Sequence, residues 1–120
     1  MALIIGSEGL VNADLIIPQG SSLYFTITHL DEQGNVIDHS QSQIELAVQE
    51  PKNEKITYMY SIYCSADSEK IIVDLPPSVS ENLKIGSYNW DLFITTQYGQ
   101  VIRAVYGKVK ILDTYVPDGR

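Results

Sequence analysis

One cysteine and two histidines are the residues whose types could support covalent chemistry. Cys64 is the only cysteine of the 120-residue chain, and it would act as a nucleophile only beside a base. His29 and His39 are candidate bases, but both are distant from it in sequence. Cys64 also falls on the apolar row of a predicted strand, where a cysteine packs as a small hydrophobic residue. We therefore expect no catalytic site and no enzymatic activity.

A metal site is the second chemistry that the two histidines suggest. With a carboxylate from Asp31 or Asp38 they could supply three ligands, but their spacing matches no established ligand motif. The segment 31–35 has the acid and glycine of a calcium-binding turn, yet it lacks the later acid that would bind calcium through both oxygens. We therefore expect a hairpin turn there, no bound metal and no required cofactor.

The eight tyrosines offer a third chemistry, because aromatic rings stack on sugars. Strand alternation places Tyr24, Tyr63 and Tyr98 on outward positions, where such stacking is feasible. It places three others on inward rows: Tyr58, Tyr60 and Tyr88. Packing in the core or at a protein contact is the other explanation, since tyrosine is enriched at interfaces. Both explanations stay open from the sequence.

The stretch 75–107 positions the centre of the expected fold. Four large residues alternate with polar ones, the period of a half-buried strand: Tyr88, Trp90, Leu92 and Ile94. Trp90 is therefore expected in the core. Ser78 and Glu81 have the spacing of a capping box, which predicts one helical turn before this strand. Gly99 predicts a hairpin turn after it, and Gly107 predicts a bulge in the returning strand.

Phe93 interrupts that alternation, because it is apolar on the outward row. Tyr24, Met59 and Tyr63 also fall on outward rows of their predicted strands. A contiguous exposed apolar patch marks a contact site. These four residues are therefore the candidate interface, through which the domain would dock on a partner or on copies of itself.

The remaining apolar segments are short and alternate with polar turns, at 14–17, 23–28, 43–49, 56–64 and 70–75. Seven or eight strands without a helix long enough for a crossover predict an all-β protein made of two antiparallel sheets packed as a sandwich. The expected sandwich domain spans 14–112. Segment 113–120 is expected to be a C-terminal tail.

Segment 1–13 is expected to be an N-terminal arm, because glycines separate its two small apolar patches. It is either frayed or an edge strand that pairs only on assembly. The expectation is an arm that is mobile in the isolated protein and ordered against a neighbour.

Charge and composition exclude several classes of partner. The formal net charge is −7 with only eight scattered basic residues, whereas nucleic-acid binding requires clustered Lys and Arg. No apolar run approaches the roughly 20 residues of a membrane span, and none resembles a secretory signal peptide. A single cysteine excludes an intramolecular disulfide and favours a reducing compartment. The expectation is synthesis in a cytoplasm, with no nucleic-acid or membrane partner.

Two segments together carry a family resemblance. The first is 14–27 with the turn at 31–35; the second runs from Leu75-Pro76 through the helical turn and 86–92 to Gly99, Arg103 and 107–109. In that order they resemble small immunoglobulin-like β-sandwich proteins in virions of tailed bacteriophages. The resemblance covers roughly 14–112, with the middle strands alike only in length and polarity.

The resemblance implies a non-enzymatic structural component of the virion, in the tail, baseplate or receptor-binding apparatus, made in the bacterial host cytoplasm. Its implied partners are other virion proteins and copies of itself. The alternative function is a carbohydrate-binding or host-surface adhesion module, for which a host-surface glycan would be the partner.

Overall fold

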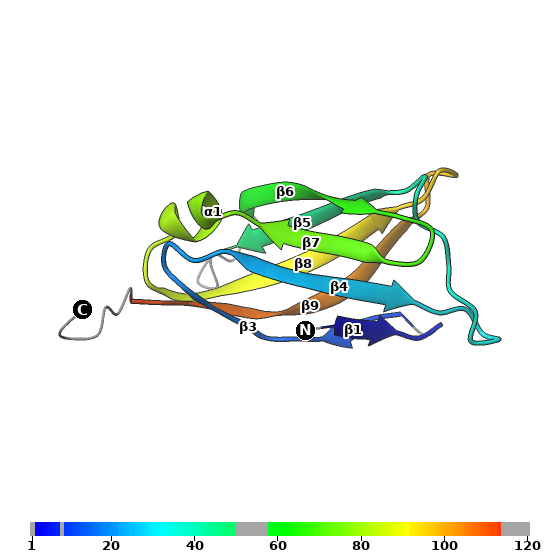
Figure 1. Cartoon of the computed structure of the whole chain (residues 1–120), viewed down its shortest axis with the longest axis horizontal. Helices are drawn as coiled ribbons and strands as arrows, with labels where there is room; N and C mark the ends of the chain where they lie inside the picture. The colour runs from blue at the N-terminus through cyan, green and yellow to red at the C-terminus, as the bar shows by residue number, and fades with distance from the viewer. Residues whose placement is uncertain (1, 8, 50–57, 114–120) are drawn as a thin grey trace.

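The described residues fold into one sheet of nine strands with one short helix (Figure 1). The structure is a computed structural model that describes residues 2–7, 9–49 and 58–113, and only the backbone of 58–60. In chain order the elements are β1 (Ala2–Ile5), β2 (Val11–Asn12), β3 (Leu15–Pro18), β4 (Leu23–His29), β5 (Gln43–Gln49), β6 (Tyr58–Ala66), β7 (Ile71–Leu75), α1 (Pro77–Glu81), β8 (Gly86–Thr95) and β9 (Val101–Leu112). The all-β class predicted from the sequence is confirmed.

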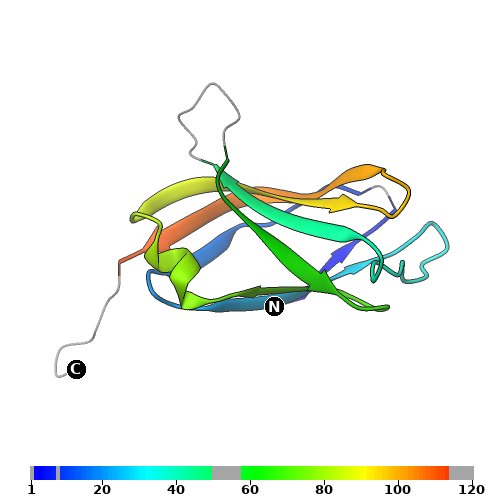
Figure 2. The same cartoon turned by 90° about the horizontal axis from the view of Figure 1, so that it is seen from above.

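The strands follow one hydrogen-bonded path, β1-β4-β7-β6-β5-β8-β9-β2, and β3 also pairs with β9. Strand β6 pairs with β5 over most of its length and with β7 at its end. The path therefore bends back on itself, and β4 and β7 come to lie opposite β8 and β9 (Figure 2). The sheet is curled nearly into a barrel.

The N-terminal segment differs from the expected separate arm. Strand β1 pairs with β4 at one end of the path, whereas β2 and β3 pair with β9 at the other. Ile5 is fully buried in the core. The physical reason is the curl of the sheet, which brings its two ends close enough for one short segment to span them. Ile5 and Ala13 of this segment are thus buried within a single chain, whereas Ile4 and Leu10 stay exposed.

Pairing is antiparallel from β4 through β9, as expected, but the three pairings made by β1, β2 and β3 are parallel. The sequence predicted that antiparallel pairs would dominate, because parallel pairs ordinarily need a long helical crossover. Here the N-terminal segment passes between the two ends of a curled sheet, so short links suffice. Within the described residues, the strands expected at 14–17, 23–28, 43–49 and 70–75 appear as β3, β4, β5 and β7; residues 56–57 and 114–120 lie outside them.

Trp90 lies at the centre of the core, with 1% of its surface exposed. Phe25 of β4 meets it edge-to-face from the opposite side, with ring centroids 6.1 Å apart. The other three residues of the predicted inward row are buried as well: Tyr88, Leu92 and Ile94. The alternation in β8 therefore predicted its core face correctly.

The helical turn exists as α1, but the predicted capping box is wrong. Pro76 occupies the N-cap and no side chain caps the helix, while Ser78 lies inside it. The contact that fixes the turn comes instead from Ser80, whose hydroxyl donates to the carbonyl of Ser21 and accepts from the amide of Gly20, each at 2.9 Å. Among the described residues, α1 is the only helix, and at five residues it is far too short to cross a membrane.

The predicted bulge at Gly107 is also wrong, although the Gly99 hairpin turn is confirmed by its φ of 84°. The register shifts between Leu92 and Phe93, which leaves Ala104 as the extra residue of β9. Gly107 is needed for another reason. A Cβ there would lie 1.9 Å from the carbonyl oxygen of Ala13, so any side chain would displace the N-terminal segment.

Candidate functional site

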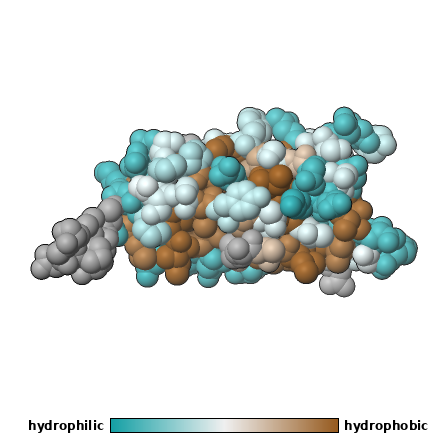
Figure 3. Space-filling model, viewed as in Figure 1, coloured by the Kyte–Doolittle hydropathy of each residue, from teal (hydrophilic) through white to brown (hydrophobic). Residues whose placement is uncertain are grey.

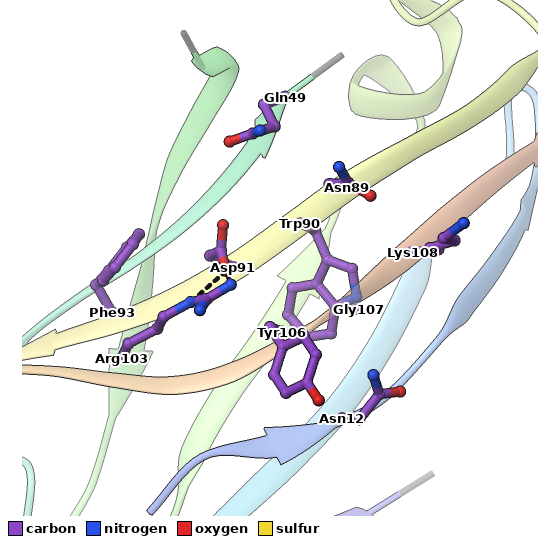
Figure 4. Close-up of a pocket in the computed structure, with 10 residues that line it drawn as sticks. All are labelled: Asn12, Gln49, Asn89, Trp90, Asp91, Phe93, Arg103, Tyr106, Gly107 and Lys108. Carbon is purple, nitrogen blue, oxygen red and sulfur yellow. Dashed lines mark hydrogen bonds and ion pairs between the residues drawn. The ribbon is translucent and has the colours of Figure 1, made fainter. Parts of the chain in front are cut away.

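The outer face of β5, β8 and β9 carries a groove of about 570 Å³, called the outer groove below. Its lining residues are Asn12, Gln49, Asn89, Trp90, Asp91, Phe93, Arg103, Tyr106, Gly107 and Lys108. Figure 4 shows Phe93 at one end of the groove, Asn12 and Tyr106 at the other, and Asp91 with Arg103 between them. Six of the ten residues carry an amide or a charge, and three are aromatic: Trp90, Phe93 and Tyr106.

Strand alternation explains how the outer groove forms. On β8, Asn89, Asp91 and Phe93 point away from the core, because Trp90 and its row point into it. Across the ladder, their partners on β9 are Lys108, Tyr106 and Arg103, respectively. The same hairpin thus supplies the buried core on one face and the groove on the other.

An ion pair occupies the middle of the outer groove. The Nε and Nη2 atoms of Arg103 lie 2.7 and 2.6 Å from Oδ1 of Asp91. The Asp91 side chain is 8% exposed and that of Arg103 is 50% exposed. The guanidinium also lies over the ring of Tyr106, 5.2 Å from its centroid. A buried carboxylate requires such a partner, so the arginine is held in place while half of its side-chain surface faces solvent.

Backbone contacts hold the rim of the outer groove next to β2. The indole Nε1 of Trp90 donates to the carbonyl of Ala13 at 2.8 Å, and the Ala13 amide donates to the carbonyl of Tyr106 at 2.8 Å. The Lys108 amide donates to Oδ1 of Asp14 at 2.9 Å. These bonds fix the N-terminal segment against β9, and Asn12 is positioned by them at the groove.

The four sequence-predicted interface residues do not form one patch. Tyr63 and Phe93 share a cross-strand row through Glu45, and Tyr63 is 64% exposed while Phe93 is partly buried. Tyr24 is 56% exposed on β4, whose neighbouring Phe25 meets Trp90 across the core. Because β4 and β8 face each other, Tyr24 and Phe93 point to opposite sides of the molecule. The side chain of Met59 lies outside the described residues.

The three tyrosines expected on outward positions likewise form no common sugar platform. Tyr24 and Tyr63 lie on the two opposite faces, and Tyr98 is 87% exposed in the turn between β8 and β9. The face that carries Tyr24 is the one shown in Figure 3, where apolar surface gathers along the edge formed by β1 and β3. Tyr88 is buried as expected, whereas the side chains of Tyr58 and Tyr60 lie outside the described residues.

Sequence reasoning missed the Asp91–Arg103 pair and Tyr106. Hairpin counting from the 97–100 turn was the available signal, since it pairs facing residues of the two strands. An unbroken register would place Asp91 opposite Val105, an apolar residue that suggests no polar site. The extra residue Ala104 shifts the ladder and brings Tyr106 opposite Asp91 instead. Because the bulge changes the register, hairpin counting could not have predicted which residues line the groove.

The structure brings the two histidines together at the far end of β4. Nδ1 of His29 lies 2.9 Å from Nε2 of His39, and their rings stack with centroids 5.1 Å apart. The second ring nitrogen of His39 bonds the hydroxyl of Ser42 at 3.0 Å. Burial lowers the pKa of both imidazoles, and the charge of His29 lowers the pKa of His39 further. The pair therefore anchors the β4–β5 loop in its neutral form.

Asp31 and Asp38, the carboxylates that could have joined the histidines in a metal site, accept hydrogen bonds within turns instead. Oδ1 of Asp31 accepts from the amides of Gln33 and Asn35, each at 2.9 Å, which confirms the expected turn. Asp38 accepts from the amide of Ser40 at 2.8 Å. Within the part of the chain that the structure describes, no three side chains of metal-binding type come together.

Cys64 lies partly buried on β6. Burial raises the pKa of its thiol to about 11, so the thiol stays protonated at neutral pH. A protonated thiol is a poor nucleophile. This supports the packing role over the catalytic one.

Within the residues that the structure describes, the outer groove and the histidine pair are two places where polar side chains from separate strands or loops converge. The groove is open to a ligand or partner, whereas the two imidazoles are occupied with each other. No protein-family model matches this chain, and no curated protein matches its sequence.

Proposed function

We propose that the protein is an immunoglobulin-like β-sandwich and a non-enzymatic structural component of a tailed-phage virion. Its place is the tail, baseplate or receptor-binding apparatus, and it acts through protein–protein contacts in the virion, with other virion proteins and copies of itself as partners.

Strand order supports the immunoglobulin-like assignment. In such sandwiches the second strand pairs with the fifth and the fifth with the fourth, while the third, sixth and seventh form the facing sheet. The pairings β4–β7, β7–β6, β5–β8 and β8–β9 follow that order. The N-terminal strands then extend both sheets, with β1 beside β4 and β3 beside β9.

Two local features support the same assignment. Tyr88, near the start of β8, donates its hydroxyl to the carbonyl of Lys84 at 2.5 Å, which is the geometry of a tyrosine corner. Trp90 follows two residues later, where antibody domains carry a cysteine. Its edge-to-face contact with Phe25 joins the two sheets at the position of their disulfide. Noncovalent aromatic packing suits a protein with one cysteine.

The observation that carries the functional proposal is large apolar side chains exposed on both outer faces. Tyr24 is exposed on the β4 face and Tyr63 on the β5–β6 face, at 56% and 64%. Ile4 and Ile16 are exposed on strands at the two ends of the sheet, at 66% and 62%. A component with neighbours on several sides would cover such residues, because protein contacts are enriched in aromatic side chains. Scattered single residues are ordinary; here they lie on both outer faces and on strands β1 and β3.

Immunoelectron microscopy of particles of the phage that encodes this chain tests the proposal. An antibody to the protein should label purified particles at a fixed position on the tail or baseplate. Phe93→Glu should reduce incorporation while the melting temperature stays unchanged. Tyr98→Glu is the matched control, since Tyr98 lies in a loop. Particles that carry no label and contain none of the chain would refute the proposal.

The runner-up is a carbohydrate-binding or adhesion module, and the outer groove is the observation that favours it. Amide groups of Asn12, Gln49 and Asn89 line it together with Phe93 and Tyr106, and sugar sites combine polar groups with aromatic rings. Measuring binding of the protein to a glycan array tests this function. The carbohydrate-binding function would be established over the structural role by two results together: Asn89→Ala abolishes glycan binding, and the protein is absent from particles.

A further inference from the structure

Acidic side chains gather at the end of the molecule where the β4–β5 loop meets the β6–β7 turn. The five are Asp31, Glu32, Asp38, Asp67 and Glu69, against one lysine, Lys70. The β4–β5 loop and the β6–β7 turn lie at the same end of the molecule (Figures 1 and 2). The charge of Asp38 also acts on Asp67. Hydrogen bonds lower the pKa of both these carboxyls, so they stay ionised at neutral pH. This group is called the acidic end below.

Strand β9 has the opposite charge. It carries Arg103, Lys108 and Lys110 and no acidic residue, although the protein has only eight basic residues and a net charge of −7. All three basic residues are exposed on the outer face, and Arg103 and Lys108 line the outer groove. Amide donors of Asn12 and Asn89 flank them. Arg103 is already paired with Asp91, so the groove presents Lys108, the exposed half of the Arg103 side chain and the amide donors, and carboxylates bind such groups.

We propose that the acidic end of one copy docks into the outer groove of a second copy. The inference rests on the proposed function, because it names the partner for one of its protein contacts. Within one chain the two surfaces cannot meet: the His29–His39 bond and the bond from the Leu30 amide to the Ile5 carbonyl hold the loop against the end of the sheet. A contact between two different surfaces is heterologous, so repetition gives a ring or a filament.

The size of the outer groove suits this occupant. At about 570 Å³ it lies within the roughly 300–1,000 Å³ of pockets that take whole ligands. Glu32 and Glu69 are exposed and are the long side chains of the acidic end. They reach beyond the three aspartates, whose oxygens bond the backbone of their own turns.

Charge reversal on each surface separately tests the inference. Lys108→Glu alters the groove, and Glu32→Lys with Glu69→Lys alters the acidic end. Neither touches the Asp91–Arg103 pair or the aspartates that shape the turns. Sedimentation of the full chain over a range of concentrations should show native self-association that weakens as salt is raised, since salt shortens the screening length from about 10 Å at 0.1 M to about 3 Å at 1 M. Each variant should weaken it by roughly tenfold or more.

The decisive arm mixes the two variants. Each retains one native surface, so an equimolar mixture should recover the association that neither variant shows alone. Matched controls carry the same charge changes elsewhere: Lys84→Glu for the groove, and Glu81→Lys with Asp74→Lys for the acidic end. All three residues lie on the surface, and the controls should self-associate as the native chain does. Circular dichroism melting establishes that every variant is folded.

Three results would overturn the inference. Loss of association in Lys108→Glu alone would mean that two grooves meet each other. A mixture that stays monomeric would exclude the heterologous contact. A native chain that is monomeric at its highest soluble concentration would exclude self-docking; groove resonances that then shift on adding oligosaccharide would assign the groove to sugar. If that monomer is still labelled on particles, the proposed function stands while this inference fails.

Discussion

The two faces of the β8–β9 hairpin solve the same packing problem in different ways. On the inner face, Trp90 fills the core and its one polar atom is satisfied by the Ala13 carbonyl. On the outer face, the adjacent Asp91 is nearly as buried, at 5% exposure against 1%, but it is covered by a half-exposed arginine. Trp90 and Asp91 are adjacent in sequence but point to opposite faces. One is enclosed in the apolar core, and the other belongs to a polar site whose arginine still presents a charge to solvent. Burial alone does not distinguish core from site; the partner of each buried group does.

Removing the inner anchor should have the largest effect. Trp90→Ala is expected to reduce the free energy of unfolding by about 3–5 kcal/mol, because it leaves a cavity beside Phe25. Urea unfolding followed by circular dichroism measures the change. Trp90→Phe separates volume from hydrogen bonding, and it should cost about 1–3 kcal/mol because the Ala13 carbonyl loses its donor. In the native protein, tryptophan emission should be that of a buried indole; a solvent-like maximum would contradict its placement.

The second-largest loss of stability is expected at Gly107, whose backbone lies close to the Ala13 carbonyl on the inner face. Gly107→Ala is expected to cost about 2–3 kcal/mol, since the new methyl group would overlap the Ala13 carbonyl and push the N-terminal segment away. Amide exchange should then accelerate in β2 and β3 more than in β5. Gly6→Ala is the matched control, because nothing lies within 4 Å of a Cβ there. Equal losses in the two variants would mean that the approach to Ala13 is unimportant.

The outer face should be less sensitive. Arg103→Met keeps the aliphatic stem but removes the cation from Asp91, at an expected cost of about 1–2 kcal/mol. The loss is smaller than for a fully buried pair because half of the arginine is exposed. Lys110→Met, on the same strand, should change stability little. If Arg103→Met reduced the free energy of unfolding as much as Trp90→Ala does, the proposed difference between the two faces would be wrong.

The histidine pair lies at the end of β4, away from both faces of the β8–β9 hairpin. Its substitution should change the free energy of unfolding least, and the change should depend on pH. Its pKa values are lowered from 6.5 in the folded state, so the unfolded chain binds more protons below that pH. Stability should therefore fall as the pH drops below about 6.5. The lowered pKa of Asp38 and of Asp67 acts only below about 3.8, in a separate window.

His29→Gln provides the test of that assignment. Denaturant unfolding at a series of pH values should show a flatter profile near pH 6 in the variant than in the native protein, while the cost of Trp90→Ala stays constant across the same range. An unchanged profile in His29→Gln would place the titrating group elsewhere.

Local patterns were sufficient for the elements that lie between β3 and β9. The alternation around Trp90 and the glycine at position 99 each depend on neighbours in sequence, so β8 and its turn could be predicted. The arm at 1–13 could not be placed, because its strands pair with residues that are distant in the chain and only a curled sheet brings those together. The role of Gly107 was misjudged for the same reason: what excludes a side chain there is the carbonyl of Ala13.

The candidate site was predictable only in part. Phe93 was recognised as outward from its position next to Trp90's row, but Tyr24 was assigned to the same patch because alternation does not tell which layer a strand belongs to. The groove depends on a one-residue bulge at Ala104, and sequence periodicity contains no rule for its position. Burial of His29 against His39 also depends on how a long loop folds back, which pattern reasoning does not reach.

The parallel pairing of β3 with β9 has a mechanical consequence. Tension applied between the segment before β3 and the segment after β9 acts along both strands in opposite directions, so it shears the ladder from Leu15↔Val109 to Pro18↔Leu112 all at once. A pull that opens an antiparallel hairpin instead peels its residue pairs one after another. The Trp90 bond to Ala13 lies at the start of that ladder and resists the same displacement. Load applied across these two segments would therefore be resisted by the whole β3–β9 ladder at once.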